Sequence, residues 1–205
     1  MNLDYLGDAL DHWKGSLFAY LQSEGALRNF AVDAMATDLV PWNEGAFRVF
    51  ARLLRINGDQ IIQHEESLLR ARDRYLSEIT HGGDIFLDPD TGIATGGRKQ
   101  IKQIEKYVRP TDLAMLLRSN SGRVVAVYQH VRAQKTCKRV DACRAAIENE
   151  IDAFGWCSYE SATVAILFLC DNDARTHEIE NAFKKLLGSH AKRRVRSGSR
   201  AGHDR

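Results

Sequence analysis

The stretch from Asp84 to Gly92 reads Asp-Ile-Phe-Leu-Asp-Pro-Asp-Thr-Gly, and the stretch from Arg123 to Val131 reads Arg-Val-Val-Ala-Val-Tyr-Gln-His-Val. Each contains a short, continuous apolar run and ends in polar or charged residues. Apolar runs without alternation are typical of strands that are buried on both faces, as in a parallel sheet covered by helices. The two stretches therefore indicate an α/β protein.

On either side of these two strands, the spacing of apolar residues predicts helices that alternate with further strands. Helices are expected at 4–22, 44–56, 59–79, 111–117, 140–154 and 176–187, and strands at 27–35, 84–87, 123–131 and 163–170. Residues 156–170 suggest a hairpin, which leaves room for an antiparallel C-terminal strand. The order predicts a mostly parallel, Rossmann-like sheet with helices on both faces.

Length and composition are those of an ordinary globular protein. The chain has 205 residues, of which 44% are hydrophobic and 27% charged, and we expect one α/β domain over residues 1–188. None of the four cysteines lies in a C-x-x-C pair, which argues against a zinc ribbon. The N-terminus lacks the basic region of a signal peptide, and the longest apolar run is too short to span a bilayer. These features predict a cytoplasmic protein with free thiols and no membrane partner.

Positive charge gathers at the end of the chain. Residues 190–205 contain six Lys or Arg and one acidic residue, whereas the preceding 189 residues carry a net charge of −3. We predict that residues 189–205 form a basic, disordered tail. Such a tail either solubilises the protein or binds nucleic acid by releasing counterions from the phosphates.

The strongest candidate site is the loop that follows the strand at 84–87. In open α/β sheets, ligands lie outside the carboxyl ends of the strands. Carboxylates placed there can bind Mg²⁺, accept a proton or hold an amine or hydroxyl group. Asp88 and Asp90 are therefore candidate catalytic residues and candidate metal ligands, and Thr91 and Gly92 are candidate binding residues. The competing interpretation is a polar turn in which an aspartate caps the next segment.

Other polar residues fall at strand ends or on one helix face. His130 is a candidate catalytic residue, as a general base. Tyr128, on the same strand, is a candidate substrate- or cofactor-binding residue. Asp33, at the end of the first predicted strand, is a candidate substrate- or cofactor-binding residue. The first predicted helix carries three more such candidates, Asp8, Asp11 and Lys14. The alternative role of these three is an ion pair within the helix. Asp171 and Asp173 follow the last strand and are weaker candidates for the same edge.

Three motifs together resemble a group of uncharacterised bacterial proteins. Those proteins begin with FGDxxDxxKYGLL, carry an FFDPDNG loop and have a strand that ends in YQH. The matching residues here are Gly7-Asp8-x-x-Asp11-x-x-Lys14, Phe86 to Ile93, Lys106-Tyr107-Val108 and Val127 to His130. The likeness extends to about residue 132 and implies a fold rather than an activity.

More distantly, the layout is similar to that of Rossmann-like methyltransferases. In members that methylate amino groups, a D-P-P-[YF] loop follows a strand, and residues 88–91 occupy that place. The resemblance implies adenosylmethionine as a cofactor. The sequence departs from it in two respects: residues 32–38 contain no glycine, and Asp90 and Thr91 replace the second proline and the aromatic residue.

Three functions stay open at this point. The first is an enzyme acting on nucleic acid or nucleotides, in which Asp88 and Asp90 hold the substrate or Mg²⁺ and His130 assists proton transfer. The second is a metal-dependent phosphoryl-transfer or hydrolytic enzyme, in which Asp88 is the nucleophile and Asp171 and Asp173 are distant metal ligands. The third is a non-catalytic binding module of a mobile-element or defence system.

Overall fold

The computed structural model describes residues 3–37, 42–64, 68, 72–97, 102–131 and 134–200. The helices are α1 (Ala9–Ser23), α2 (Glu44–Leu54), α3 (Arg72–Ser77), α5 (Pro110–Ser119), α6 (Thr136–Glu148) and α7 (Asp173–Leu187). The strands are β1 (Ala31–Asp33), β2 (Ile61–Ile62), β3 (Ile85–Leu87), β4 (Gly92–Ile93), β5 (Tyr107–Val108), β6 (Val125–His130), β7 (Phe154–Glu160), β8 (Val164–Cys170) and β9 (Val195–Arg200). Short 3₁₀ helices are η1 (Leu3–Tyr5), η2 (Gly58–Gln60), η3 (Ile104–Lys106) and η4 (Gly188–Arg193).

A seven-stranded sheet with the order β2-β1-β3-β6-β8-β7-β9 forms the centre of the fold. The first four strands in this order are parallel, and β8, β7 and β9 each run antiparallel to the strand before them. β4 and β5 form a separate parallel pair. The prediction of an α/β fold with a mostly parallel, Rossmann-like sheet and an antiparallel C-terminal part is therefore confirmed.

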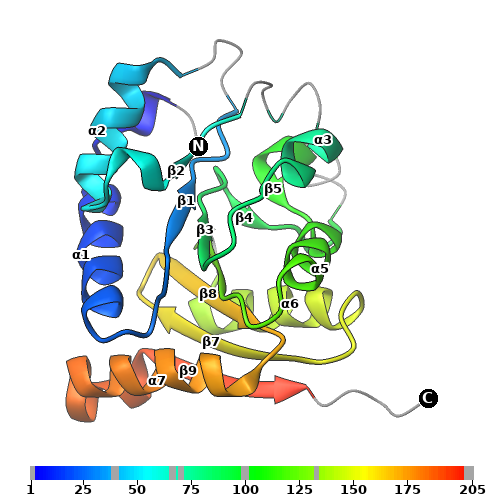
Figure 1. The fold of residues 1–205 in the computed structure, drawn as a ribbon. Helices are drawn as coiled ribbons and strands as arrows, with labels where there is room; N and C mark the ends of the chain where they lie inside the picture. Colours follow the sequence, from blue (N-terminus) through cyan, green and yellow to red (C-terminus); the bar gives the residue numbers. More distant parts are fainter. Residues whose placement is uncertain are drawn as a thin grey trace.

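Helices cover both faces of the sheet (Figure 1). One core cluster packs α1, α2 and α7 on one face, and a second packs α3, α5 and α6 on the other. Successive residues of β6 point to opposite faces: Val125 and Val127 belong to the second cluster, and Ala126 and Tyr128 to the first. Because both faces are buried, the strand contains an apolar run instead of an alternating pattern.

The predicted helix at 59–79 is wrong over its first part. Ile61 and Ile62 form β2, which pairs in parallel with β1, and α3 covers only Arg72–Ser77. Two adjacent isoleucines fit a helical face and a strand equally well, and pairing with β1 decides for the strand. The predicted helix at 140–154 is likewise shifted: α6 is Thr136–Glu148, and Phe154 begins β7.

The predicted disordered tail is wrong for residues 189–200. These residues form most of η4 and all of β9, which pairs with β7 from Phe154↔Arg200 to Tyr159↔Val195. The sequence of β9 is polar and contains glycine, so its β-propensity is low. The free edge of β7 supplies the partner that this segment needs to become a strand. Residues 201–205 lie outside the described residues.

Candidate functional site

The chain reverses its direction across the sheet between β1 and β3. From β1 it crosses to β2 on one side and then returns to β3 on the other side. Loops diverge at such a switch point and leave a crevice outside the carboxyl ends of the strands. Asp33 ends β1, and Asp88 directly follows β3, so both carboxylates lie at this point.

Lys14 of α1 joins the first motif to the loop after β3. Its Nζ atom lies 2.6 Å from Oδ2 of Asp88 and 2.8 Å from Oδ1 of Asp11, and all three side chains are buried. Asp11 Oδ2 also accepts a hydrogen bond from the backbone N–H of Gly7, while Asp8 caps α1 by accepting from Leu10 and Asp11. The spacing Gly7-Asp8-x-x-Asp11-x-x-Lys14 thus builds a buried ionic clamp on Asp88.

Burial by itself would lower the pKa of Lys14, but the charges of Asp88 and Asp11 outweigh it and raise that pKa above 10.5. Burial raises the pKa of Asp88 above its usual value of 3.8, against the effect of the Lys14 ammonium. The clamp therefore places the Lys14 amino group between the carboxyl groups of Asp11 and Asp88.

The raised Lys14 pKa predicts a loss of stability in alkali. A group whose pKa is raised by folding stabilises the folded state below its unfolded pKa, and this stabilisation is lost as the pH rises through the folded value. We expect the difference in free energy of unfolding between the parent and Lys14→Met to narrow above pH 10.5. Urea unfolding of both proteins across this range measures it, and a constant difference would contradict the buried ion pair.

Backbone and side-chain bonds fix the loop that follows Asp88. The backbone N–H of Asp88 donates to the carbonyl of Asp33 (3.0 Å), and Thr91 donates to that of Lys106 (3.1 Å). Thr37 Oγ1 donates to Asp90 Oδ2 at 2.7 Å. Asp90 and Thr91 are half-buried, unlike Asp88, so they are the loop side chains that can meet a ligand.

Gln129 connects the loop to β6. Its Oε1 accepts from the backbone N–H of Ile93 (2.9 Å) and from the Cys143 thiol (3.2 Å), and its Nε2 donates to the carbonyls of Thr91 and His130. Burial raises the pKa of Cys143 to about 11, so the thiol stays protonated and can donate. Gln129 is fully buried, and although sequence reasoning did not choose it as a site residue, it positions Gly92 and His130.

His130 lies beside this loop at the end of β6. Its backbone N–H donates to the carbonyl of Thr91, and its Nδ1 lies 3.1 Å from the Tyr128 hydroxyl. The Lys14 ammonium lies 5.1 Å from the centre of the Tyr128 ring, within reach of a cation–π contact. The half-buried imidazole therefore joins the same cluster, and the three motifs found in the sequence converge on one edge of the sheet.

Asp33 is held by the chain's own groups. Its Oδ1 accepts from the Met35 N–H and the Tyr75 hydroxyl, and its Oδ2 lies 2.9 Å from His64 Nε2. The rings of His64 and Tyr75 stack with their centres 3.5 Å apart. Sequence reasoning placed both residues on a long surface helix and missed them, because nothing local indicates that they meet Asp33.

The described residues do not fit the cofactors that the sequence suggested. Among them, no group of three or more His, Cys, Asp or Glu side chains could hold a metal ion. Lys14 already supplies the positive charge beside Asp88 that a cation would bring. Adenosylmethionine also fits poorly, because the fully buried Met35 side chain stands where a glycine-rich turn would lie, and the His64 and Tyr75 side chains already occupy the Asp33 carboxylate.

Asp171 and Asp173 lie at the opposite edge of the sheet, so the prediction that placed them with Asp88 is wrong. β8 runs antiparallel to β6, and Val125, the first residue of β6, pairs with Leu169 near the end of β8. Asp171 instead accepts from Ser121 and from the backbone of Gly122. The rule that ligands lie at the carboxyl ends of strands also predicts Asp38 and Arg132 at the edge that carries Asp88, but both lie outside the described residues.

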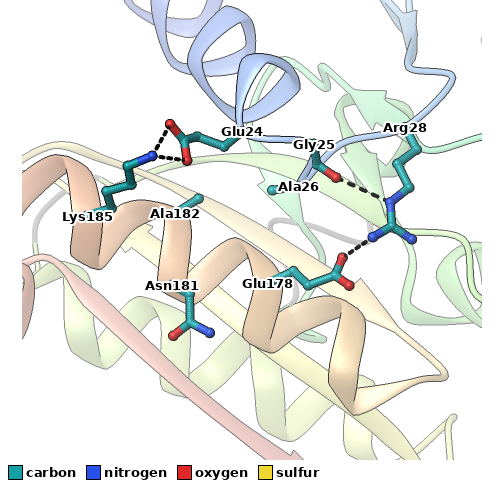
Figure 2. Close-up of a pocket in the computed structure, with 8 residues that line it drawn as sticks. All are labelled: Glu24, Gly25, Ala26, Arg28, Glu178, Asn181, Ala182 and Lys185. Atoms are coloured by element: carbon teal, nitrogen blue, oxygen red, sulfur yellow. Dashed lines mark hydrogen bonds and ion pairs between the residues drawn. The ribbon is translucent and has the colours of Figure 1, made fainter.

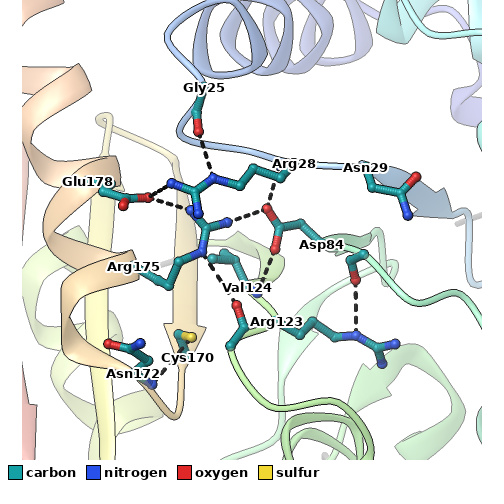
Figure 3. A network of polar contacts seen from close by, with 12 residues as sticks. Gly25, Arg28, Asn29, Asp84, Arg123, Val124, Cys170, Asn172, Arg175 and Glu178 are labelled. Carbon is teal, nitrogen blue, oxygen red and sulfur yellow. Dashed lines mark hydrogen bonds and ion pairs between the residues drawn. The ribbon is translucent and has the colours of Figure 1, made fainter.

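The opposite edge is held together by ion pairs (Figure 3). Asp84, buried at the start of β3, accepts from the backbone of Arg28 and Val124 and pairs with Arg175. Arg28 and Arg175 both contact Glu178. Every carboxylate of this network has arginine or backbone partners. Because Arg175 and Glu178 belong to α7 and Asp84 adjoins β3, the network holds α7 against the sheet.

A cavity of about 400 Å³ lies beside that network, between the end of α1 and α7. Figure 2 shows its charged side chains turned toward one another. Lys185 binds Glu24, and Arg28 binds Glu178. Because these charges neutralise each other, the cavity offers a ligand no excess charge, and the carboxyl edge stays the better candidate.

No helix among the described residues is long and apolar enough to cross a membrane. No protein-family model and no curated protein matches the chain. One solved structure that resembles it is a protein of Legionella pneumophila described by the family model DUF519, with 10% sequence identity and a TM-score of 0.44. The match covers 89% of this chain, which spans 65% of the other protein's length. At this distance the comparison says nothing about activity.

Proposed function

We propose that this chain is an enzyme that acts on nucleotides or nucleic acid at the carboxyl edge of β1, β3 and β6, on a scaffold with a methyltransferase-like layout. The observation that supports the proposal is the convergence of three separated motifs on that edge. Asp88 is paired with Lys14, Asp90 and Thr91 follow it, and Tyr128 and His130 adjoin them. A site assembled from three distant segments is more than a polar turn.

The residues of this cluster divide by exposure. Asp88, Asp11 and Lys14 are buried and hold the loop in place, so they are positioning residues in this proposal. In this proposal the half-buried Asp90 and Thr91 accept hydrogen bonds from the amino or hydroxyl groups of a nucleotide. Asp90 Oδ2 also accepts from Thr37, and Asp90 Oδ1 is enclosed by the protein before a ligand binds. His130 accepts or returns a proton, with its ring oriented by Tyr128.

The alternative phosphoryl-transfer function has less support. An aspartate nucleophile needs a free oxygen facing the substrate, whereas Asp88 is buried with Oδ2 bound to Lys14. The other proposed metal ligands, Asp171 and Asp173, lie at the far edge. A non-catalytic binding module would use the same edge but would show no turnover.

Ligand-dependent thermal stability tests the proposal. A ligand at 100 times its dissociation constant adds about 2.7 kcal/mol to the free energy of unfolding, which is an easily measured shift. We expect a shift with mononucleotides in the parent and a smaller one in Asp90→Asn. We expect none with Mg²⁺ alone, because no group of three or more His, Cys, Asp or Glu side chains among the described residues could hold a metal ion. We expect none with adenosylmethionine, because the buried Met35 takes the place of a glycine-rich turn.

The opposite results would separate the alternatives. A shift with adenosylmethionine would restore methyl transfer, and a shift with Mg²⁺ alone would favour phosphoryl transfer or hydrolysis. A flat response to every compound would refute the proposed site. Because His130 is assigned to proton transfer, His130→Ala should keep the mononucleotide shift and lose any turnover.

A further inference from the structure

Three consecutive cationic residues close η4 and lead into β9. We call Lys192, Arg193 and Arg194 the basic turn; all three side chains are exposed. Among the described residues, no carboxylate pairs with them, and the Arg194 guanidinium donates to the backbone carbonyl of Glu160. Other cations nearby are neutralised; these are Lys184 by Glu180, Lys185 by Glu24, and Arg196 by Glu160 and Asp141.

The sheet register places the basic turn on the same edge as the candidate site. Gln129 of β6 pairs with Ala165 of β8, Ala165 pairs with Glu160 of β7, and the Glu160 N–H donates to the Arg194 carbonyl. These four residues form one row across the sheet. Three strand spacings separate Gln129 from Arg194, about 14 Å, and His130 is the residue after Gln129.

Two aromatic side chains lie between the site and the basic turn. Trp13 of α1 and Tyr159 of β7 are half-buried, and their ring centres are 5.8 Å apart. Trp13 precedes Lys14 of the clamp, and Tyr159 pairs in register with Val195, which follows the basic turn. The edge therefore presents the acidic loop (residues 88–92) with His130, then aromatic rings, then unneutralised cations.

We propose that the substrate of this site is single-stranded nucleic acid, whose phosphates contact the basic turn while one nucleotide reaches Asp90 and His130. The inference rests on the proposed function, which it narrows from nucleotides in general to a polynucleotide. Cations neutralise the backbone, and aromatic faces stack on bases only where the bases are unpaired. In this arrangement the basic turn gives affinity for the phosphates, and the acidic loop repels them.

The salt dependence of binding tests this surface. Each phosphate contact on a single strand contributes about 0.7 to the slope of log K against log salt concentration. We expect the full chain to bind a short fluorescent single-stranded oligonucleotide, and Lys192→Ala/Arg193→Ala to lower that slope by about 1.4. The matched control, Lys184→Ala/Lys185→Ala, also removes two charges from the neighbouring helix and should leave the slope unchanged, because those lysines are already paired.

Three results would overturn the inference. The salt-dependence slope is unchanged in Lys192→Ala/Arg193→Ala, or the control variant lowers the slope by the same amount, or the parent protein does not bind the oligonucleotide at low salt. Mononucleotide stabilisation separates it from the proposed function. If mononucleotides stabilise the protein but Lys192→Ala/Arg193→Ala does not change the slope, the proposed site at Asp90 and His130 is retained and the contact at the basic turn is refuted. If Lys192→Ala/Arg193→Ala lowers the slope, but mononucleotides do not stabilise the protein and Asp90→Asn changes nothing, the contact at the basic turn is retained and the proposed site is refuted.

Discussion

Lys14→Met is expected to destabilise the protein by about 3–5 kcal/mol, because removing one partner of a buried ion pair leaves the other charge uncompensated. Here two carboxylates depend on the same ammonium, and Asp11, Lys14 and Asp88 are all at most 4% exposed. Methionine keeps most of the side-chain volume, so the change isolates the charge. Urea unfolding at neutral pH measures the loss through the shift in midpoint.

Lys184→Met serves as the control, since it removes an ammonium whose partner is Glu180 on the surface of α7. Its side chain is 55% exposed, and exposed pairs of this kind contribute about 0–1 kcal/mol. Equal effects of the two substitutions would contradict a buried clamp. If Lys14→Met also reduces the thermal stabilisation by mononucleotides, the ionic clamp positions the loop that carries Asp90.

Gly92→Ala should destabilise the protein by about 3 kcal/mol or more, from backbone strain together with overpacking. Gly92 has φ +127°, and a β-carbon at this position would lie 2.4 Å from Oε1 of Gln129. Gln129 cannot turn aside, because it is fully buried and holds Ile93, Thr91, His130 and Cys143 by hydrogen bonds. Thermal unfolding gives the stability, and the mononucleotide shift reports whether the loop keeps its geometry.

Gly96→Ala is the matched variant for this experiment. Gly96 also has a positive φ, +85°, but a β-carbon there would meet nothing within 4 Å. It should therefore cost only the backbone strain, about 1–3 kcal/mol. A Gly92→Ala protein no less stable than Gly96→Ala would show that Gln129 does not limit the space above the loop.

The outline of the site could be predicted from sequence because strand ends are visible in local pattern. The runs before Asp88 and before His130 are apolar and end abruptly in polar residues, and parallel strands bring their carboxyl ends to one edge. The same reasoning failed for Asp171, since a strand's apolar composition does not reveal its direction. The antiparallel pairing of β8 with β6 moved Asp171 to the opposite edge.

Other parts of the site depend on partners far along the chain. Lys14 and Asp88 are 74 residues apart, and without the fold their spacing carries no signal of a contact. His64 and Tyr75 meet Asp33 only because β2 pairs with β1 and α3 packs beside it. Side-chain contacts between distant segments are set by tertiary packing.

Local sequence pattern was enough to predict the α/β class, the main strands at 85–87, 125–130 and 164–170, and the position of the acidic loop, because burial on both sheet faces leaves an apolar run that is visible locally. The contact between Lys14 and Asp88, the strand β9 and the shared edge of the basic turn and His130 depend instead on the packing of distant segments. A polar segment such as β9 has little strand propensity of its own, and the open edge of β7 provides its hydrogen-bond partners.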